Sequence, residues 1–207
     1  MRTDNAFAKD LAMAACCNLS TGITYGFLHG YETTRGRDLD FLKDFFVINA
    51  PFVGHPMLLV GLFAELQYQR HKDIHQQLYS KYLEKSEDAK RHISSVNTSH
   101  RHVGQHTKIT QDVLGITEKI SWLQQDVANF HLRLEAMIES SQYIGNAMVD
   151  KADKEAIDYG PKFRARLKEM SFEYKNLTSQ GAMVKDGCSV VIAAVSLTLT
   201  VALWRCL

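Results

Sequence analysis

The 207-residue chain is predicted to be all-α, a long antiparallel helical bundle or coiled-coil stalk whose last helix continues into a C-terminal transmembrane segment. Three observations predict this fold. Apolar residues recur at alternating spacings of four and three from Ile109 to Met148, and again from Phe163 to Cys188. Residues 188–204 then contain no charged side chain. The first two patterns have the 3.5-residue period of packed helices, and the third is typical of a membrane helix.

Composition excludes several classes of function. The net charge is +1, so no strong positive field recruits nucleic acid, and only three prolines interrupt a chain that suits helices. The positions of the four cysteines indicate neither a disulfide framework nor a zinc ribbon. They are read as small apolar residues, with S-acylation near a membrane as the alternative for Cys206 or the pair Cys16 and Cys17.

Residues 1–54 are expected to form an irregular, short-helix region. Leu11–Cys17 is interpreted as a short helix, and the glycine-rich stretch 20–36 as loop or short extended segments. Asp38 and Asp40 can cap another short helix, and prolines 51 and 56 then break the chain.

Residues 55–187 are expected to form the bundle, and its first helix should begin after Pro56. Residues 57–66 are apolar on nearly all sides. An amphipathic pattern follows, whose apolar face comprises Ile74, Leu78, Tyr79, Tyr82 and Leu83. Residues 84–107 are polar, and two interpretations stay open: an exposed helix end followed by a loop, or a solvated helical continuation.

The stripe from Ile109 to Met148 dominates the bundle. Its positions are Ile109, Val113, Ile116, Ile120, Leu123, Val127, Phe130, Leu134, Met137, Ser141, Ile144 and Met148. It is flanked by Leu114, Trp122, Ala128, Ala136 and Tyr143, and Glu135 is the single charge at these flanks. So broad an apolar face favours packing in a bundle against residues 57–83 and 162–187 over a free coiled-coil rod. Self-association or partner helices are expected along this 109–148 stripe, and Pro161 is expected to open the last helix.

Residues 188–207 are expected to be a membrane anchor that contacts the lipid bilayer through 188–204. Seventeen uncharged residues span roughly 26 Å as a helix, close to the hydrocarbon thickness of a bilayer. A buried helix or strand is the alternative. Six basic residues against three acidic ones between 162 and 186 predict a single-pass protein with its N-terminal bulk in the cytoplasm.

Histidine pairs are the only candidates for chemistry. His71 and His75, like His102 and His106, are four residues apart, a spacing that puts two imidazoles on one helical face where a metal ion can bridge them. No further ligand completes either pair, and solvated histidines are the preferred interpretation. No nucleotide-binding, hydrolase or Cys-x-x-Cys motif occurs, so neither enzymatic activity, a cofactor nor a small-molecule substrate is expected.

The order of these elements is similar to one known family. The segment 55–70 opens with His55-Pro56-Met57-Leu58-Leu59, a heptad helix follows, and a basic helix Phe163–Lys185 runs into the apolar stretch 192–197. This order resembles the C-terminal half of fungal CorA-like magnesium transporter proteins. The resemblance implies stalk helices that lead into a membrane helix lining a five-subunit pore. The family's Gly-Met-Asn motif and second membrane helix are missing, so the resemblance implies a degenerate or truncated relative that does not conduct ions alone.

Three functional hypotheses follow. The first is a membrane protein of transporter-like ancestry that assembles through its stalk. The second is a tail-anchored coiled-coil adaptor that binds partner helices. The third is a soluble bundle whose C-terminal segment belongs to the core.

Overall fold

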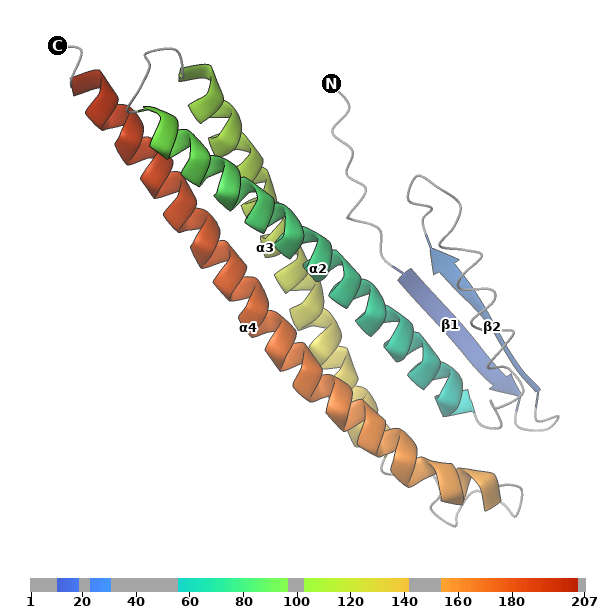
Figure 1. Cartoon of the computed structure of the whole chain (residues 1–207). Helices are drawn as coiled ribbons and strands as arrows, with labels where there is room; N and C mark the ends of the chain where they lie inside the picture. Colours follow the sequence, from blue (N-terminus) through green and yellow to red (C-terminus); the bar gives the residue numbers. More distant parts are fainter. Residues whose placement is uncertain (1–10, 19–22, 31–55, 97–102, 142–153, 205–207) are drawn as a thin grey trace. The chain divides into compact units, whose positions relative to one another are not determined.

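The computed structural model describes the backbone of residues 11–18, 23–30, 56–96, 103–141 and 154–204, and the side chains of 61–95, 104–141 and 161–201. The elements are β1 (Leu11–Asn18), β2 (Ile23–Gly30), α2 (Pro56–Val96), α3 (Val103–Ser141) and α4 (Lys154–Trp204) (Figure 1). Every side chain that is described lies in one of the three helices. The predicted all-α bundle is confirmed for this part of the chain.

A two-stranded hairpin precedes the helices. β1 and β2 pair antiparallel, with Leu11 opposite Gly30 and Asn18 opposite Ile23. The prediction of a short helix at Leu11–Cys17 is therefore wrong, because this segment is a strand. An isolated seven-residue helix is marginal in water, whereas pairing with β2 satisfies the backbone groups of β1. The short helix predicted after Asp38 and Asp40 lies outside the described residues.

The chain divides into two compact units, and the division cuts across all three long helices. The first unit contains residues 1–70 and 130–173, and the second contains residues 71–129 and 174–207. Each unit therefore takes a section of α2, a section of α3 and a section of α4, so each is described separately.

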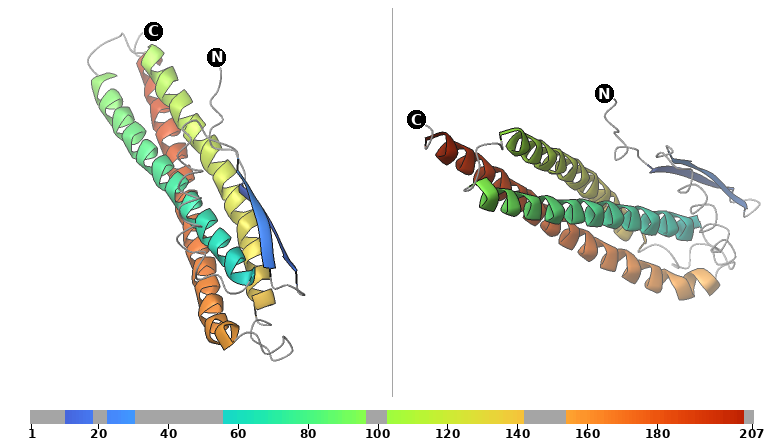
Figure 2. Two further views of the ribbon diagram at one scale, coloured as in Figure 1. Left: turned by 90° about the vertical axis from the view of Figure 1, so that its right-hand side faces the viewer. Right: turned by 45° about the horizontal axis from the view of Figure 1, so that its top comes forward.

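The side-chain contacts within the second unit give the directions of its helices. Between α2 and α3, Lys85 meets Asp112 and His92 meets His106, so one number rises as the other falls and the helices are antiparallel. Between α2 and α4 the numbers rise together: His71 meets Tyr174, and Tyr82 meets Gly187. The helices therefore run up, down and up, as the turned views also show (Figure 2).

The same order holds in the first unit. Phe63 of α2 contacts Phe130 of α3, with ring centroids 6.4 Å apart. On the other side, Phe163 of α4 lies against the backbone of Gly61, where a Cβ atom would collide with the aromatic ring. Glycine at position 61 thus permits a close approach of α2 and α4 that no larger residue allows without a shift.

The predicted inner stripes form the core. The α3 positions Ile109, Val113, Ile116, Ile120, Leu123, Val127, Phe130 and Leu134 are buried. On α4 the buried positions are Leu167, Met170, Tyr174, Leu177, Val184 and Cys188. The flanking residues behave differently from the prediction, since Leu114 is 51% and Trp122 is 55% exposed. Their predicted contribution to the bundle is wrong, because the other two helices, α2 and α4, cover only one face of α3. Tyr143, Ile144 and Met148 lie outside the described residues.

The helix boundaries bear on three parts of the sequence interpretation. α2 continues to Val96, so the polar residues 84–96 are helical, and residues 97–102 lie outside the described residues. α3 is helical to Ser141, and the predicted continuation to Met148 lies outside the described residues. α4 begins at Lys154 and contains Pro161 within it, so the prediction that Pro161 opens the helix is wrong. Pro161 is the eighth residue of α4, so it removes a hydrogen bond of the helix interior and its ring crowds the carbonyl group of the preceding turn.

Candidate functional site

Four histidines point into the bundle rather than into solvent. His71, His75, His92 and His106 are between 2% and 8% exposed, so the preferred interpretation of solvated histidines is wrong for them. The predicted apolar face of α2 includes Tyr79 and Leu83, but these side chains are 44% and 45% exposed. The inner face of α2 holds histidines instead. An imidazole is partly apolar and can be buried when its ring nitrogens find partners.

His71 is held by a hydrogen bond across the bundle. Its Nδ1 lies 2.9 Å from the hydroxyl of Tyr174 on α4, and the two rings meet edge to face at 5.7 Å. Tyr174 is fully buried. A buried tyrosine hydroxyl needs a hydrogen-bond partner, and His71 supplies it, so this pair fixes α2 against α4.

His75 lies one turn further along α2 and is less well satisfied. Burial lowers the pKa of His75, and a hydrogen bond to the backbone of Gln180 opposes part of that shift. Its Nε2 is buried with no hydrogen-bond partner among the described residues. Because the charged form is disfavoured there, His75 is a neutral imidazole in the folded protein at neutral pH.

His92 and His106 bring α2 and α3 together near the ends of these helices. Their ring centroids lie 4.2 Å apart, edge to face. Within the described ranges, no three His, Cys, Asp or Glu side chains gather where they could hold a metal ion. Of the metal candidates, the structure places His71 and His75 on one inner face of α2 and brings His106 to His92. His102 lies outside the described residues.

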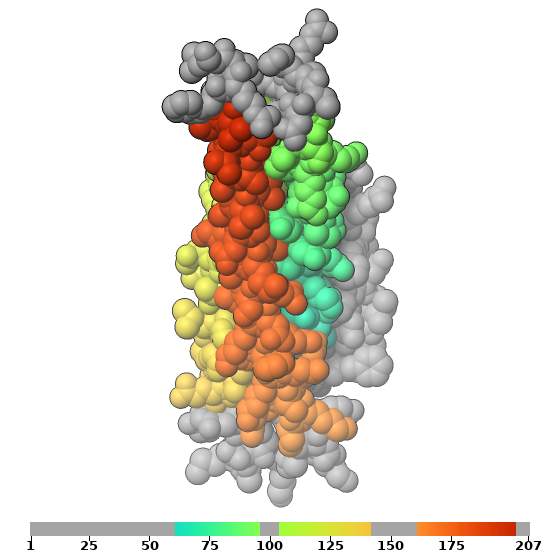
Figure 3. Space-filling view, turned by 60° about the vertical axis from the view of Figure 1, so that its left-hand side comes forward, coloured from blue at the N-terminus to red at the C-terminus, as the bar shows by residue number. Residues whose placement is uncertain are grey.

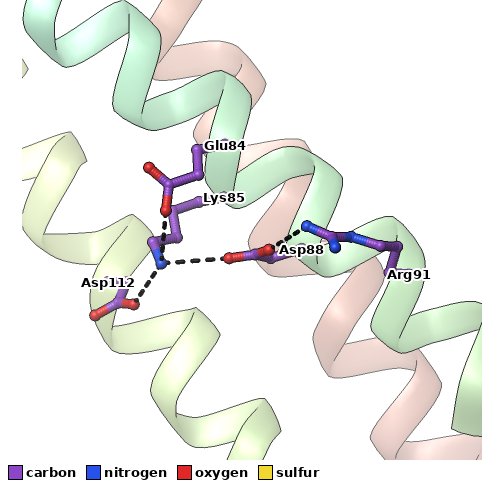
Figure 4. A network of polar contacts seen from close by, with 5 residues as sticks. All are labelled: Glu84, Lys85, Asp88, Arg91 and Asp112. Atoms are coloured by element: carbon purple, nitrogen blue, oxygen red, sulfur yellow. Dashed lines mark hydrogen bonds and ion pairs between the residues drawn. The ribbon is translucent and has the colours of Figure 1, made fainter.

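A charged network joins α2 and α3 between these histidine pairs (Figure 4). Lys85 Nζ lies 3.3 Å from Asp112 Oδ2 and 3.3 Å from Asp88 Oδ2. Asp88 also binds Arg91, at 2.8 Å. The hydrogen bond to Asp112 is the largest cause of a raised pKa for Lys85. The network places charged groups of both signs on this section of the second unit.

A second network lies in the first unit. Arg166 of α4 binds the carboxylate of Glu65 through Nε at 2.9 Å and Nη2 at 2.8 Å, and its Nη1 reaches Glu169 at 2.8 Å. Burial raises the pKa of the neighbouring Tyr68, and the nearby carboxylate of Glu173 raises it further. The forked geometry is that of a strong Arg–carboxylate pair. In the sequence, Glu65 lies within the largely apolar stretch 57–66, and nothing local indicates its partner 101 residues away.

The uncharged end of α4 has two different faces. Cys188, Val191 and Val195 are buried on the inner face, and the Cys188 thiol is hydrogen-bonded to Thr117 of α3. Val190 and Leu197 lie on the outer face and are 68% and 67% exposed. This outer face is open in the space-filling view, where α4 lies in front (Figure 3). In the described part of the chain, one helix is long and apolar enough to cross a membrane, and it is this one.

Comparison with known proteins assigns no relative. The chain matches no protein-family model, no curated protein and no solved structure.

Proposed function

We propose that this chain is a non-enzymatic, membrane-anchored helical protein that attaches to the bilayer through residues 188–204. The observation that carries the proposal is the uncharged end of α4, which presents Val190, Leu197 and Val201 on its outer surface. Large apolar side chains exposed together on a helix without any charge favour a lipid environment over water. The rest of the bundle then serves as an interaction module held at the membrane.

The proposed orientation rests on the charges that precede the anchor. Lys175 and Lys185 on α4, with four further basic residues from 162 to 168, outnumber the acidic residues of the same stretch. Basic residues beside a membrane helix remain on the cytoplasmic side. The bundle is accordingly proposed to lie in the cytoplasm.

Vesicle flotation of full-length protein tests the anchor. The double substitution Val190→Lys with Leu197→Lys places two charges on the exposed outer face, where no core packing is lost. A charge at the centre of a membrane helix costs about 3 kcal/mol, so we expect the vesicle-bound fraction to fall at least about tenfold.

The matched control is Phe172→Lys with Met183→Lys. Both residues are exposed on α4, at 64% and 73%, and both precede the uncharged segment. We expect this control to float like the unmodified protein. Equal flotation of the two double variants, or an unmodified protein that stays with the soluble fraction, would contradict the anchor and favour a soluble bundle.

The transporter-like ancestry is a second candidate, and one observation favours it. α4 is a single helix from Lys154 to Trp204 that carries the basic stretch directly into the apolar one, as the stalk helices of CorA-like proteins lead into their membrane helices. This candidate requires a pentamer in detergent and divalent-cation flux when partner subunits are present. A monomer or dimer without flux would favour an adaptor that binds partner helices.

A further inference from the structure

The outer half of α4 lies beside charged sections of both neighbouring helices. Tyr82 of α2 lies against Gly187, where a Cβ atom would be 2.6 Å from the tyrosine Cζ, and Thr117 of α3 is hydrogen-bonded to Cys188. Because α2 runs parallel to α4, its residues after Tyr82 lie beside the uncharged segment. Because α3 runs antiparallel, its residues before Thr117 do so as well.

Those two stretches contain the Lys85 network. Lys85, Asp88 and Arg91 follow Tyr82 on α2, and Asp112 precedes Thr117 on α3. If residues 188–204 crossed the hydrocarbon core with both neighbours still attached, these four charged side chains would lie at the same depth. Charged side chains at that depth are strongly disfavoured, so the docked arrangement is incompatible with a membrane-spanning one.

The docked arrangement is itself well packed. Cys188 and Val195 are at most 2% exposed, and Val191 is 8% exposed. Because α3 runs antiparallel to α4 from the contact between Thr117 and Cys188, the buried α3 residues Ile109, Val113 and Ile116 fall on the same section of the unit. The same α4 residues would have to leave α3 in order to contact lipid.

We infer that residues 188–204 have two mutually exclusive positions, docked on α2 and α3 or inserted in the bilayer. This inference rests on the proposed membrane attachment. Leaving the docked position would remove α4 from the inner stripe of α3 at Ile109, Val113 and Ile116. Gly187 directly precedes residues 188–204. Because glycine has no side chain, it leaves room for Tyr82 and also lowers the stability of the helix at this position.

A reversible cross-link tests the exclusivity. In full-length protein with Cys16, Cys17 and Cys206 replaced by serine, Thr117→Cys would place a second thiol next to that of Cys188. The protein is made in a cell-free system without lipid, and one portion is oxidised while another is kept reduced. Both are then floated with vesicles of phosphatidylcholine containing a minority of phosphatidylglycerol.

We expect oxidation to lower the vesicle-bound fraction by about tenfold or more, and reduction to restore it. A disulfide between positions 117 and 188 would hold residues 188–204 on α3 and so prevent their insertion into the bilayer. Two controls with a single cysteine, one at 117 and one at 188, should bind equally before and after oxidation. Equal binding of the oxidised and reduced double-cysteine protein would overturn the inference while leaving the proposed anchor intact. If the reduced protein does not bind vesicles, the proposed anchor is rejected. If it yields no soluble monomer without lipid, the docked state is rejected.

A second pair of variants tests the opposite direction. Gly187→Phe forces a ring against Tyr82 and should raise the vesicle-bound fraction. Ser189→Phe adds the same apolar ring to an exposed position two residues later on α4 and leaves the Tyr82 contact unchanged. Greater binding of Gly187→Phe than of Ser189→Phe supports release of the docked segment. Equal binding would mean that added hydrophobicity alone acts, which would contradict the inference.

Discussion

The inner faces of α2 and α3 meet in the same bundle but are built from different residues. Every buried α3 position from Ile109 to Leu134 is apolar, with His106 preceding them, whereas α2 buries Gln67, His71, His75 and His92 among its apolar residues. An apolar face needs only complementary shape. A polar face needs a specific partner for each group, such as Tyr174 for His71. The α3 face therefore stabilises the bundle chiefly by apolar burial, whereas the α2 face also fixes which residues lie opposite one another.

The strongest test of this difference is a charge in the α3 face. Val127 is 1% exposed, so Val127→Asp buries a carboxylate without a partner and should lower the free energy of unfolding by about 3–5 kcal/mol. Urea unfolding followed by circular dichroism measures the change. Ala128→Asp is the control, because Ala128 is exposed one position away and the substitution there should cost about 0.6 kcal/mol. Equal losses in the two variants would show that the stripe is not packed.

A smaller effect is expected from the α2 face when the pH falls. Burial lowers the pKa of His75 below its ordinary value of 6.5. At a pH between the two pKa values, His75 is therefore protonated in the unfolded chain and neutral in the folded chain. The contribution of His75 to stability is therefore full above pH 6.5 and decreases as the pH falls through 6.5 toward the lower folded pKa. Unfolding free energies measured between about pH 7.5 and pH 5.5 should decrease with acidity. His75→Leu should show a shallower decrease, and an unchanged slope would mean that His75 is not responsible.

The smallest effect is expected at the surface where α2 and α3 meet. A double-mutant cycle with Lys85→Gln and Asp112→Asn should give a coupling of about 0.5 kcal/mol, because both side chains remain partly exposed and are screened by solvent. High salt should remove that coupling. The matched pair Glu87 and Lys90 lies within α2 and is more exposed, so its cycle should give no measurable coupling. A larger coupling at Glu87 and Lys90 than at Lys85 and Asp112 would contradict this ranking.

The difference between the two faces also accounts for what could be predicted from the sequence. The heptad spacing located α3 and the inner face of α4, because apolar residues that recur at this period place one continuous stripe along a helix. On α2 the predicted apolar face contains Leu78, which is buried, but also Tyr79 and Leu83, which are exposed, and it omits the buried His71 and His75. A buried histidine is recognised by its partner, and the partner of His71 lies 103 residues away. The contact between Glu65 and Arg166 was missed for the same reason, and strand β1 was missed because its pairing partner decides its conformation.

The up, down and up order of the helices has a consequence for the time course of folding. His92 and His106 are fourteen positions apart, so α2 and α3 can meet after closing a short loop. α4 reaches α2 only after closing a loop of about a hundred residues, which carries a larger entropic penalty and a slower rate. α3 can pair with α4 through a loop almost as short, since Arg164 and Ser141 are 23 positions apart, so the contacts between α2 and α4 are expected to form last. Until the third helix docks, part of the α3 stripe is left uncovered, so the order of assembly decides which section of that stripe is exposed to water during folding.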